Sequence, residues 1–413
     1  MAAWPNPALP LLLVGALLAF EDWLTTPSCS GGSPAARASG DLRAMMVADL
    51  MLLGSDASYA DRYFRDHFMS KFFANSIQTL KPDMIVVLGD ISAKGSELTE
   101  HKWISVIEQF EGILGRYSSL PLHIALGDKD VGTCTNLDGK SVHRRAKHLP
   151  GLDSSGCGAF EISNVSFVSL NAVALLCGNN ALRFGVEKVM ERENHHFQTE
   201  SVNEEECYSL GCGKRESFAD ISWRRNSMKS GSGPVILLHF PLHRSDGEMT
   251  GVPTFPEAIV SDHSSVSSTS KHSGANGRRL YDQLHKLPAN STQYILQALK
   301  PSSLEERLRD VCFVIPFIYC VLMIVFNAHT SSFSDFVHAD GTREVTVPAM
   351  TWKTRGVPGF VIATFDAKGG ATVGCCSCSE DMMTTSPVQP GKLGGKSLPL
   401  HGGQCMEPQS TSL

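Results

Sequence analysis

The eight residues DMIVVLGD, at positions 83–90, decide the fold expected for this chain. The apolar run MIVVL ends at Gly89 and is followed directly by Asp90. Runs without alternation suit strands that are covered on both faces, as in a parallel sheet flanked by helices. A Gly-Asp pair after a single strand usually marks only a turn. The pair gains meaning here because the same arrangement recurs along the chain.

The segments around this strand alternate between strand and helix patterns. Residues 42–54 (LRAMMVADLMLLG) and 120–128 (LPLHIALGD) have the same buried-strand composition, whereas residues 58–80 and 97–114 carry apolar side chains at helical spacing. This β-α-β-α-β order predicts an α/β fold with a mainly parallel sheet and right-handed crossovers. The apolar stripe expected on the first helix comprises Tyr63, Phe64, Phe68, Phe72, Phe73 and Ile77.

The chain divides into a leader, a linker, one large domain and a tail. Residues 1–26 contain the uncharged run PALPLLLVGALLAF, which is short for a spanning helix and predicts a signal peptide or signal anchor. Residues 27–41 are small and polar, which predicts a linker, and residues 379–413 predict a disordered tail. The domain is expected over residues 42–378. Loop insertions are expected near residues 180–230, 245–280 and 302–322.

Further core strands are expected in the second half of the domain. Residues 159–176 predict a hairpin followed by another strand that ends near Asn171, and residues 233–244 predict a core strand that ends on His239. The apolar run at 311–326 fits either a membrane helix or a core strand, and its continuation into NAHTSS favours the strand. Residues 361–376 predict a terminal hairpin.

A polar ligand-type side chain follows each of five predicted strands. These residues are Asp49, Asp90, Asp128, His239 and His329, which are up to 280 residues apart. The carboxyl ends of parallel strands share one edge of a sheet, so we expect the five groups to converge there. Carboxylates with imidazoles suit divalent ions of the Mn, Fe or Zn type. Two such ions would hold a phosphate and activate a water.

Composition narrows the class of partner and the compartment. The formal net charge is -6 and no basic block is present, so nucleic acid is not expected as a partner. Twelve cysteines are compatible with an oxidising lumen, and none of them form a paired CxxC zinc pattern. Asn164 and Asn290 each begin a glycosylation triplet, a pattern that is common by chance.

Seven blocks between residues 42 and 365 resemble the calcineurin-like metallophosphoesterases, and more closely the eukaryotic branch that remodels glycosylphosphatidylinositol (GPI) anchors. The blocks are ADLMLLGS, PDMIVVLGDISAKG, ALGDKDVG, FVSLNAVAL, LLHFPLHR, FNAHTSS and REVTVPAMTWK…PGF. The family blocks read D-x-H, G-D-x-x-D, G-N-H-D, H and G-H-x-H. The resemblance implies a four-layer α/β/β/α sandwich of two mixed sheets. It also implies a metal-dependent, typically manganese-dependent, removal of ethanolamine phosphate from the GPI glycan in the early secretory pathway.

The resemblance assigns metal ligands residue by residue, and the match is incomplete. One metal of the family would use Asp90, Asp128, His239 and His329, which are all present, with Asp128 standing where the family has Asn. The other would use Asp49, Asp90 and two histidines, whose positions hold Met51 and Ser331. A thioether is a poor ligand for Mn²⁺. The sequence therefore predicts one well-built divalent-metal site, with Mn as the expected ion, and a weak or absent second site.

The catalytic residues expected from the third block are Lys129 and Asp130. Lys129 replaces a family histidine that binds or protonates the departing group. A lysine holds a phosphate oxygen as a point charge, but it is a poor proton donor at neutral pH. Asp335 and His338 either compensate for the lost ligands or belong to a solvated loop.

Two hypotheses of different classes follow from these residues. The first is a metal-dependent phosphoesterase of the endoplasmic reticulum or early secretory pathway, membrane-associated or luminal, which acts on a GPI-type glycolipid or another phosphodiester with reduced activity. The second is a catalytically silent fold that binds or traffics a partner, as Met51, Lys129 and Ser331 suggest.

Overall fold

The structure is a computed structural model of the 413-residue chain. It describes residues 8–29, 40–163, 165–177, 181–200, 222–223, 234–244, 286–299, 323–351, 357–366 and 370–378. The expected insertions at 245–280 and 302–322, the tail and Asn164 lie outside these residues.

The first sheet contains the strands that the opening segments predicted. Its order is β1-β13-β12-β2-β3-β4, and β2 (Leu42–Val47), β3 (Met84–Leu88) and β4 (Leu122–Ala125) run parallel to one another. The terminal hairpin, β12 (Gly359–Phe365) and β13 (Ala371–Ser377), extends this sheet antiparallel to β2. The predicted β-α-β-α-β unit is confirmed.

The second sheet has the order β10-β11-β9-β8-β6-β5-β7 and is also mixed. Its centre is parallel, because β6 (Val165–Ser169), β8 (Val235–Leu237), β9 (Ile324–Asn327) and β11 (Arg343–Thr346) pair in that direction. Antiparallel strands flank it at both edges. They are β5 (Gly158–Ile162), β7 (Ser222–Trp223) and β10 (Ser334–Val337).

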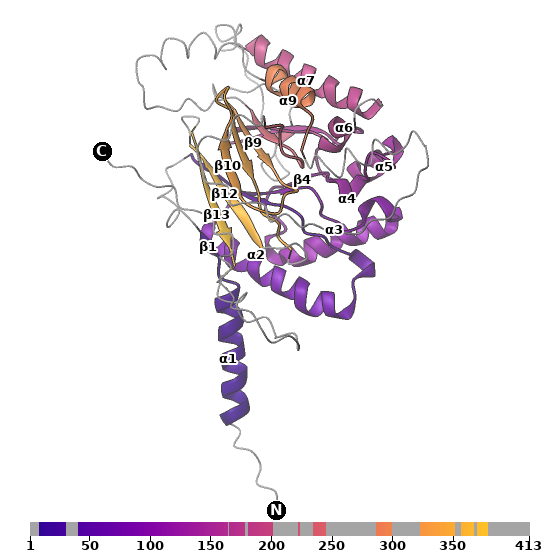
Figure 1. Ribbon diagram of the computed structural model, residues 1–413. Coiled ribbons are helices and arrows are strands. Elements are labelled where there is room, and N and C mark those ends of the chain that lie inside the picture. The colour runs from indigo at the N-terminus through magenta and orange to yellow at the C-terminus, as the bar shows by residue number, and fades with distance from the viewer. Residues whose placement is uncertain are drawn as a thin grey trace, which may run out of the picture.

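The two sheets pack face to face, and helices cover their outer faces (Figure 1). Successive side chains of β2 point to opposite faces of the first sheet. Ala44 and Met46 face the core between the two sheets, whereas Met45 and Val47 face the layer of helices. The helices α2 (His67–Leu80) and α3 (Glu100–Leu114) cover the first sheet. The helices α6 (Ala172–Leu176), α7 (Ala181–Glu200) and α9 (Ala289–Ala298) lie by the second. The predicted four-layer sandwich is confirmed.

Three local expectations were wrong. Tyr63 and Phe64 were assigned to the apolar stripe of the first helix, but they lie in a π-helical turn, Asp61–Asp66, and are 60% and 76% exposed. Residues 158–169 form only the hairpin β5–β6, whose second strand ends at Ser169, and no additional strand follows within residues 170–177. The Asn171 side chain instead caps helix α6 by accepting a hydrogen bond from the Ala174 amide. Part of the predicted linker is strand β1 (Ser28–Cys29), which pairs with β13.

Among the residues that the structure describes, two disulfides join distant parts of the domain. Cys29 is bonded to Cys376, which fixes β1 to the terminal hairpin, and Cys134 is bonded to Cys177. Within the segment predicted as a leader, residues 8–24 form helix α1 (Ala8–Leu24), which extends away from the body of the molecule (Figure 1). None of the described helices combines the length and apolar character required to cross a membrane.

Candidate metal centre

The five predicted ligand-type side chains converge, and they come from both sheets rather than from one. Asp49, Asp90 and Asp128 follow β2, β3 and β4 of the first sheet. His239 follows β8 and His329 follows β9 of the second. The parallel strands at the centre of each sheet end at the same side of the sandwich, so their loops meet across the inter-sheet core.

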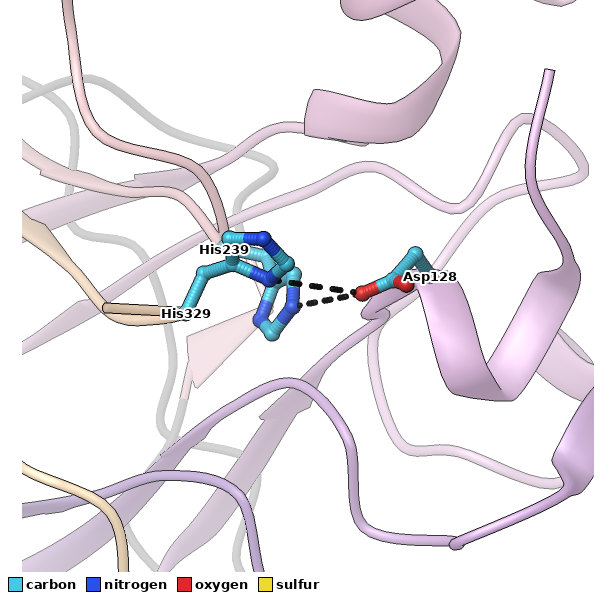
Figure 2. A group of neighbouring side chains, drawn as sticks. All are labelled: Asp128, His239 and His329. Carbon is cyan, nitrogen blue, oxygen red and sulfur yellow. Dashed lines mark hydrogen bonds and ion pairs between the residues drawn. The ribbon is translucent and has the colours of Figure 1, made fainter. Parts of the chain in front are cut away.

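Asp128 and the two histidines form one group of possible ligands (Figure 2). His239 Nε2 lies 3.1 Å from Asp128 Oδ1, and His329 Nδ1 lies 3.5 Å from the same oxygen. Asp128 and His239 are buried, and His329 is 11% exposed. Figure 2 shows the two imidazoles approaching the carboxylate from separate segments, while Asp128 begins the short helix α4 (Asp128–Val131).

Asp49, Asp90 and His239 form a second group that shares His239 with the first. In each group the ligand atoms lie within 4.8 Å of one another. Burial raises the pKa of both Asp49 and Asp90 above the ordinary range. Asp49 Oδ1 is buried, and no described residue donates a hydrogen bond to it. Such an orphaned carboxylate oxygen fits a ligand position for a cation.

The tautomer of His239 is fixed by the backbone of the first sheet. Its Nδ1 donates a hydrogen bond to the Leu88 carbonyl at 2.8 Å, so Nε2 faces Asp128 and Asp90. Burial alone would lower the pKa of His239, but the carboxylates of Asp90 and Asp128 raise it to about 10. Burial likewise opposes ionisation of Asp128, but hydrogen bonds from His239 and His329 hold its pKa well below the usual range. Positive charge between these groups is therefore favourable, whether carried by a proton or by a metal ion.

The backbone around the site is held in left-handed conformations that non-glycine residues seldom adopt. Asp49, Asp90 and His329 have φ values of 53°, 54° and 70°. Met51 and Ser331, at the two positions where the family carries histidines, have φ values of 52° and 61°. Strained conformations of this kind collect at functional sites. Five residues in the loops around the site thus share a backbone conformation of this strained kind.

Asp130 lies beneath the site and joins its loops. Its carboxylate accepts hydrogen bonds from the amides of Asp90, Ser92 and Gly127 at 2.9–3.0 Å, and its side chain is completely buried. Burial raises the pKa of Asp130 to about 6, against the effect of these amides. This geometry positions Asp90 and Asp128, and a direct catalytic role for Asp130 stays a prediction.

Lys129 reaches over the carboxylates from the start of α4. Its Nζ lies 3.5 Å from Asp128 Oδ2 and 3.8 Å from Asp90 Oδ2, and the side chain is 43% exposed. Burial opposes the charged form, but the carboxylates of Asp90 and Asp128 raise the pKa of Lys129 above its ordinary value. The site therefore has a charged, partly exposed ammonium beside two of its carboxylates.

Asp335 and His338 do not compensate for the missing ligands. Asp335 lies on β10 and accepts two hydrogen bonds from Arg343 at 2.7–2.9 Å. His338 is buried and contacts Glu344 at 3.0 Å. The alternative of a solvated loop is also wrong for these residues, because they belong to an ordered hairpin of the second sheet. His338 and Glu344 are both buried. Their contact could not be predicted from the sequence, because no local pattern indicates that the two side chains meet in the domain interior.

The sequence is similar to those of known phosphoesterases. No family model matches the sequence. A protein named Metallophosphoesterase 1 from Ailuropoda melanoleuca is 24% identical over 379 residues, covering 90% of this chain and 81% of the relative. Its namesake from Cricetulus griseus is 26% identical over 344 residues, covering 82% and 73%. A crystal structure of a dimetal phosphatase from Danio rerio covers 78% of this chain and 92% of that chain, with 13% identity and a TM-score of 0.40.

The paired mixed sheets and the carboxylate–imidazole cluster at their strand ends are the features in which this chain resembles the calcineurin-like metallophosphoesterases. Within that class, the sequence relatives described above share the name Metallophosphoesterase 1.

Proposed function

We propose that the chain is a metal-dependent phosphoesterase built around one divalent ion, with Mn²⁺ as the expected ion. The supporting observation is the group formed by Asp128, His239 and His329, with Asp90 Oδ1 3.6 Å from His239 Nε2. Two imidazoles with two carboxylates are a suitable donor set for Mn²⁺ or Zn²⁺. Asp49, whose Oδ1 lacks a hydrogen bond from any described donor, would complete the site.

The metal, when bound, would supply Lewis-acid stabilisation of the phosphoryl oxygens and lower the pKa of a water molecule. The chain itself provides the remaining elements of the chemistry. Lys129 would hold a phosphate oxygen through its ammonium group, and Asp130 would keep the Asp90 and Asp128 loops together. The Leu88 carbonyl would orient the His239 ring. Losing the family histidine at position 129 removes a proton donor, which typically costs about 10²- to 10⁴-fold in rate.

A phosphodiester of a GPI-type glycolipid is the substrate class that the sequence resemblance supports. Membrane association through α1 is compatible with the structure, since Leu11, Leu12 and Leu18 are 72%, 70% and 52% exposed. The base of α1 is held to α2, where Lys71 Nζ lies 2.8 Å from Glu21 Oε2. Disulfides between Cys29 and Cys376 and between Cys134 and Cys177 favour the early secretory pathway over the cytosol. Asn290, which begins the second glycosylation triplet, is exposed, whereas Ser291 and Thr292 are buried.

A silent binding or trafficking fold is the second candidate. It is favoured by Met51 and Ser331, which occupy left-handed positions of the site without offering an imidazole. Metal content separates the two candidates: one Mn²⁺ per purified chain supports the enzyme, and none supports the silent fold.

The activity test compares the wild-type chain with His239→Ala in hydrolysis of bis(p-nitrophenyl) phosphate in the presence of Mn²⁺. We expect turnover by the wild type that the variant lacks, because His239 belongs to both ligand groups. Equal rates in the two proteins would overturn the proposal.

A further inference from the structure

Glu344 on β11 is a completely buried carboxylate with a donor for each of its lone-pair directions. Oε1 accepts hydrogen bonds from the Leu242 amide at 2.8 Å and from Asn327 Nδ2 at 2.6 Å. Oε2 accepts one from Arg244 Nε at 2.9 Å and contacts His338 Nε2 at 3.0 Å. Four polar groups therefore converge on one carboxylate in the interior of the second sheet.

The segments joined by Glu344 are those that carry the two histidines of the metal centre. Leu242 lies three residues after His239, and Asn327 lies two residues before His329. The same segments are joined by their backbone, since the Ala328 amide donates to the His239 carbonyl at 3.0 Å. One residue thus links both imidazole loops to a third strand, β11, which pairs in parallel with β9.

The conformation of His329 requires support of this kind. Its φ of 70° is unfavourable for a residue with a side chain and persists only where the surroundings fix it. Burying a carboxylate is also costly unless its oxygens are satisfied. Burial raises the pKa of Glu344, but the contacts with His338 and Arg244 lower it below the ordinary value, so the group is ionised. An ionised carboxylate with a partner for each oxygen holds the segments of those partners in fixed positions relative to one another.

We propose that Glu344 is a positioning residue for the metal centre, which sets the relative placement of His239 and His329 through Leu242 and Asn327. This role rests on the proposed metal-dependent function, but it acts on the geometry of the metal-free protein as well. Partners behind metal ligands typically change metal affinity by 10- to 100-fold when they are removed. Because Glu344 acts through the loops rather than on the rings, we expect a loss of about tenfold.

The test uses Glu344→Gln and Asn327→Ala in the full chain, with Arg343→Gln as the matched control. Arg343 is the neighbour of Glu344 on β11, but its side chain contacts Asp335 and the Ala371 carbonyl instead of the histidine loops. Two readouts are recorded. The first is the set of imidazole ¹⁵N signals of His239 and His329 in the metal-free protein, and the second is the affinity for Mn²⁺ alone.

Glu344→Gln and Asn327→Ala are expected to shift or broaden both imidazole signals and to weaken Mn²⁺ binding about tenfold, while Arg343→Gln leaves both unchanged. Wild-type imidazole signals in a folded Glu344→Gln chain would overturn the positioning role. Loss of folded protein in both test variants, with the control folded, would also overturn it in favour of a general structural role. A wild-type chain that binds no Mn²⁺ contradicts the proposed function, and the imidazole signals still decide the role of Glu344.

Discussion

Replacing Lys129 with methionine should change metal binding and substrate binding in opposite directions. The ammonium lies 3.5 Å from Asp128 Oδ2 and 3.8 Å from Asp90 Oδ2, so it competes with a cation for the same carboxylates. The side chain is 43% exposed, and a water-like dielectric is therefore appropriate. Two unit charges about 4 Å apart interact by about 1 kcal/mol in water, so repulsion of a divalent ion amounts to roughly 2 kcal/mol.

A repulsion of this size corresponds to an affinity change of roughly thirtyfold. We expect Lys129→Met to bind Mn²⁺ roughly thirtyfold more tightly than the wild type. We also expect a higher KM for a phosphodiester, because a contact with the phosphate is lost. Isothermal titration with Mn²⁺ and steady-state hydrolysis measure the two effects. The control is Lys102→Met, since Lys102 is 45% exposed and pairs with Asp56 on the surface. Mn²⁺ binding that is unchanged or weaker in Lys129→Met would refute this reasoning.

Three further predictions concern other parts of the chain. Met51→His combined with Ser331→His should raise the metal content from one ion toward two, since both positions keep their left-handed backbone; an unchanged metal-to-protein ratio by elemental analysis would contradict the ligand assignment. Gly127→Ala should abolish Mn²⁺ binding in a titration, because the added methyl group would overlap the Asp90 carboxylate; retained affinity would refute the packing argument. Burial lowers the pKa of His123 to about 3 from about 6.5, so only the unfolded chain takes up the proton between these values. In urea unfolding, the stability of the wild type relative to His123→Phe should be constant above pH 6.5 and fall by about 1.4 kcal/mol per pH unit below it; a flat difference would count against a neutral buried imidazole.

Much of the first sheet could be predicted from the sequence, because its parallel strands and the helices between them are consecutive along the chain. The Asp90 strand is an unbroken apolar run, and parallel pairing places its end beside those of the strands before Asp49 and Asp128. The convergence of these carboxylates could thus be inferred from residue order alone. Placing His239 and His329 opposite them, on a separate sheet, required the tertiary structure.

Other features depend on packing that no local pattern encodes. Tyr63 and Phe64 have helical spacing, but spacing does not reveal that a π-helical turn rotates them toward solvent. The run AVALL after Asn171 is too short for its period to identify it as a helix, and the Asn171 cap marks where helix α6 begins. The Glu344 junction joins residues about 100 positions apart, so its partners emerge only when the sheet is assembled.

The bond between Cys29 and Cys376 spans 347 residues and closes nearly the whole domain into a covalent ring. A protease that cuts the chain once anywhere inside this ring produces two fragments that stay attached to each other. The nicked molecule would therefore migrate as one band in a non-reducing gel and separate into two bands only after thiol treatment. By the same reasoning, removal of a leader that ends before Cys29 would leave the ring intact.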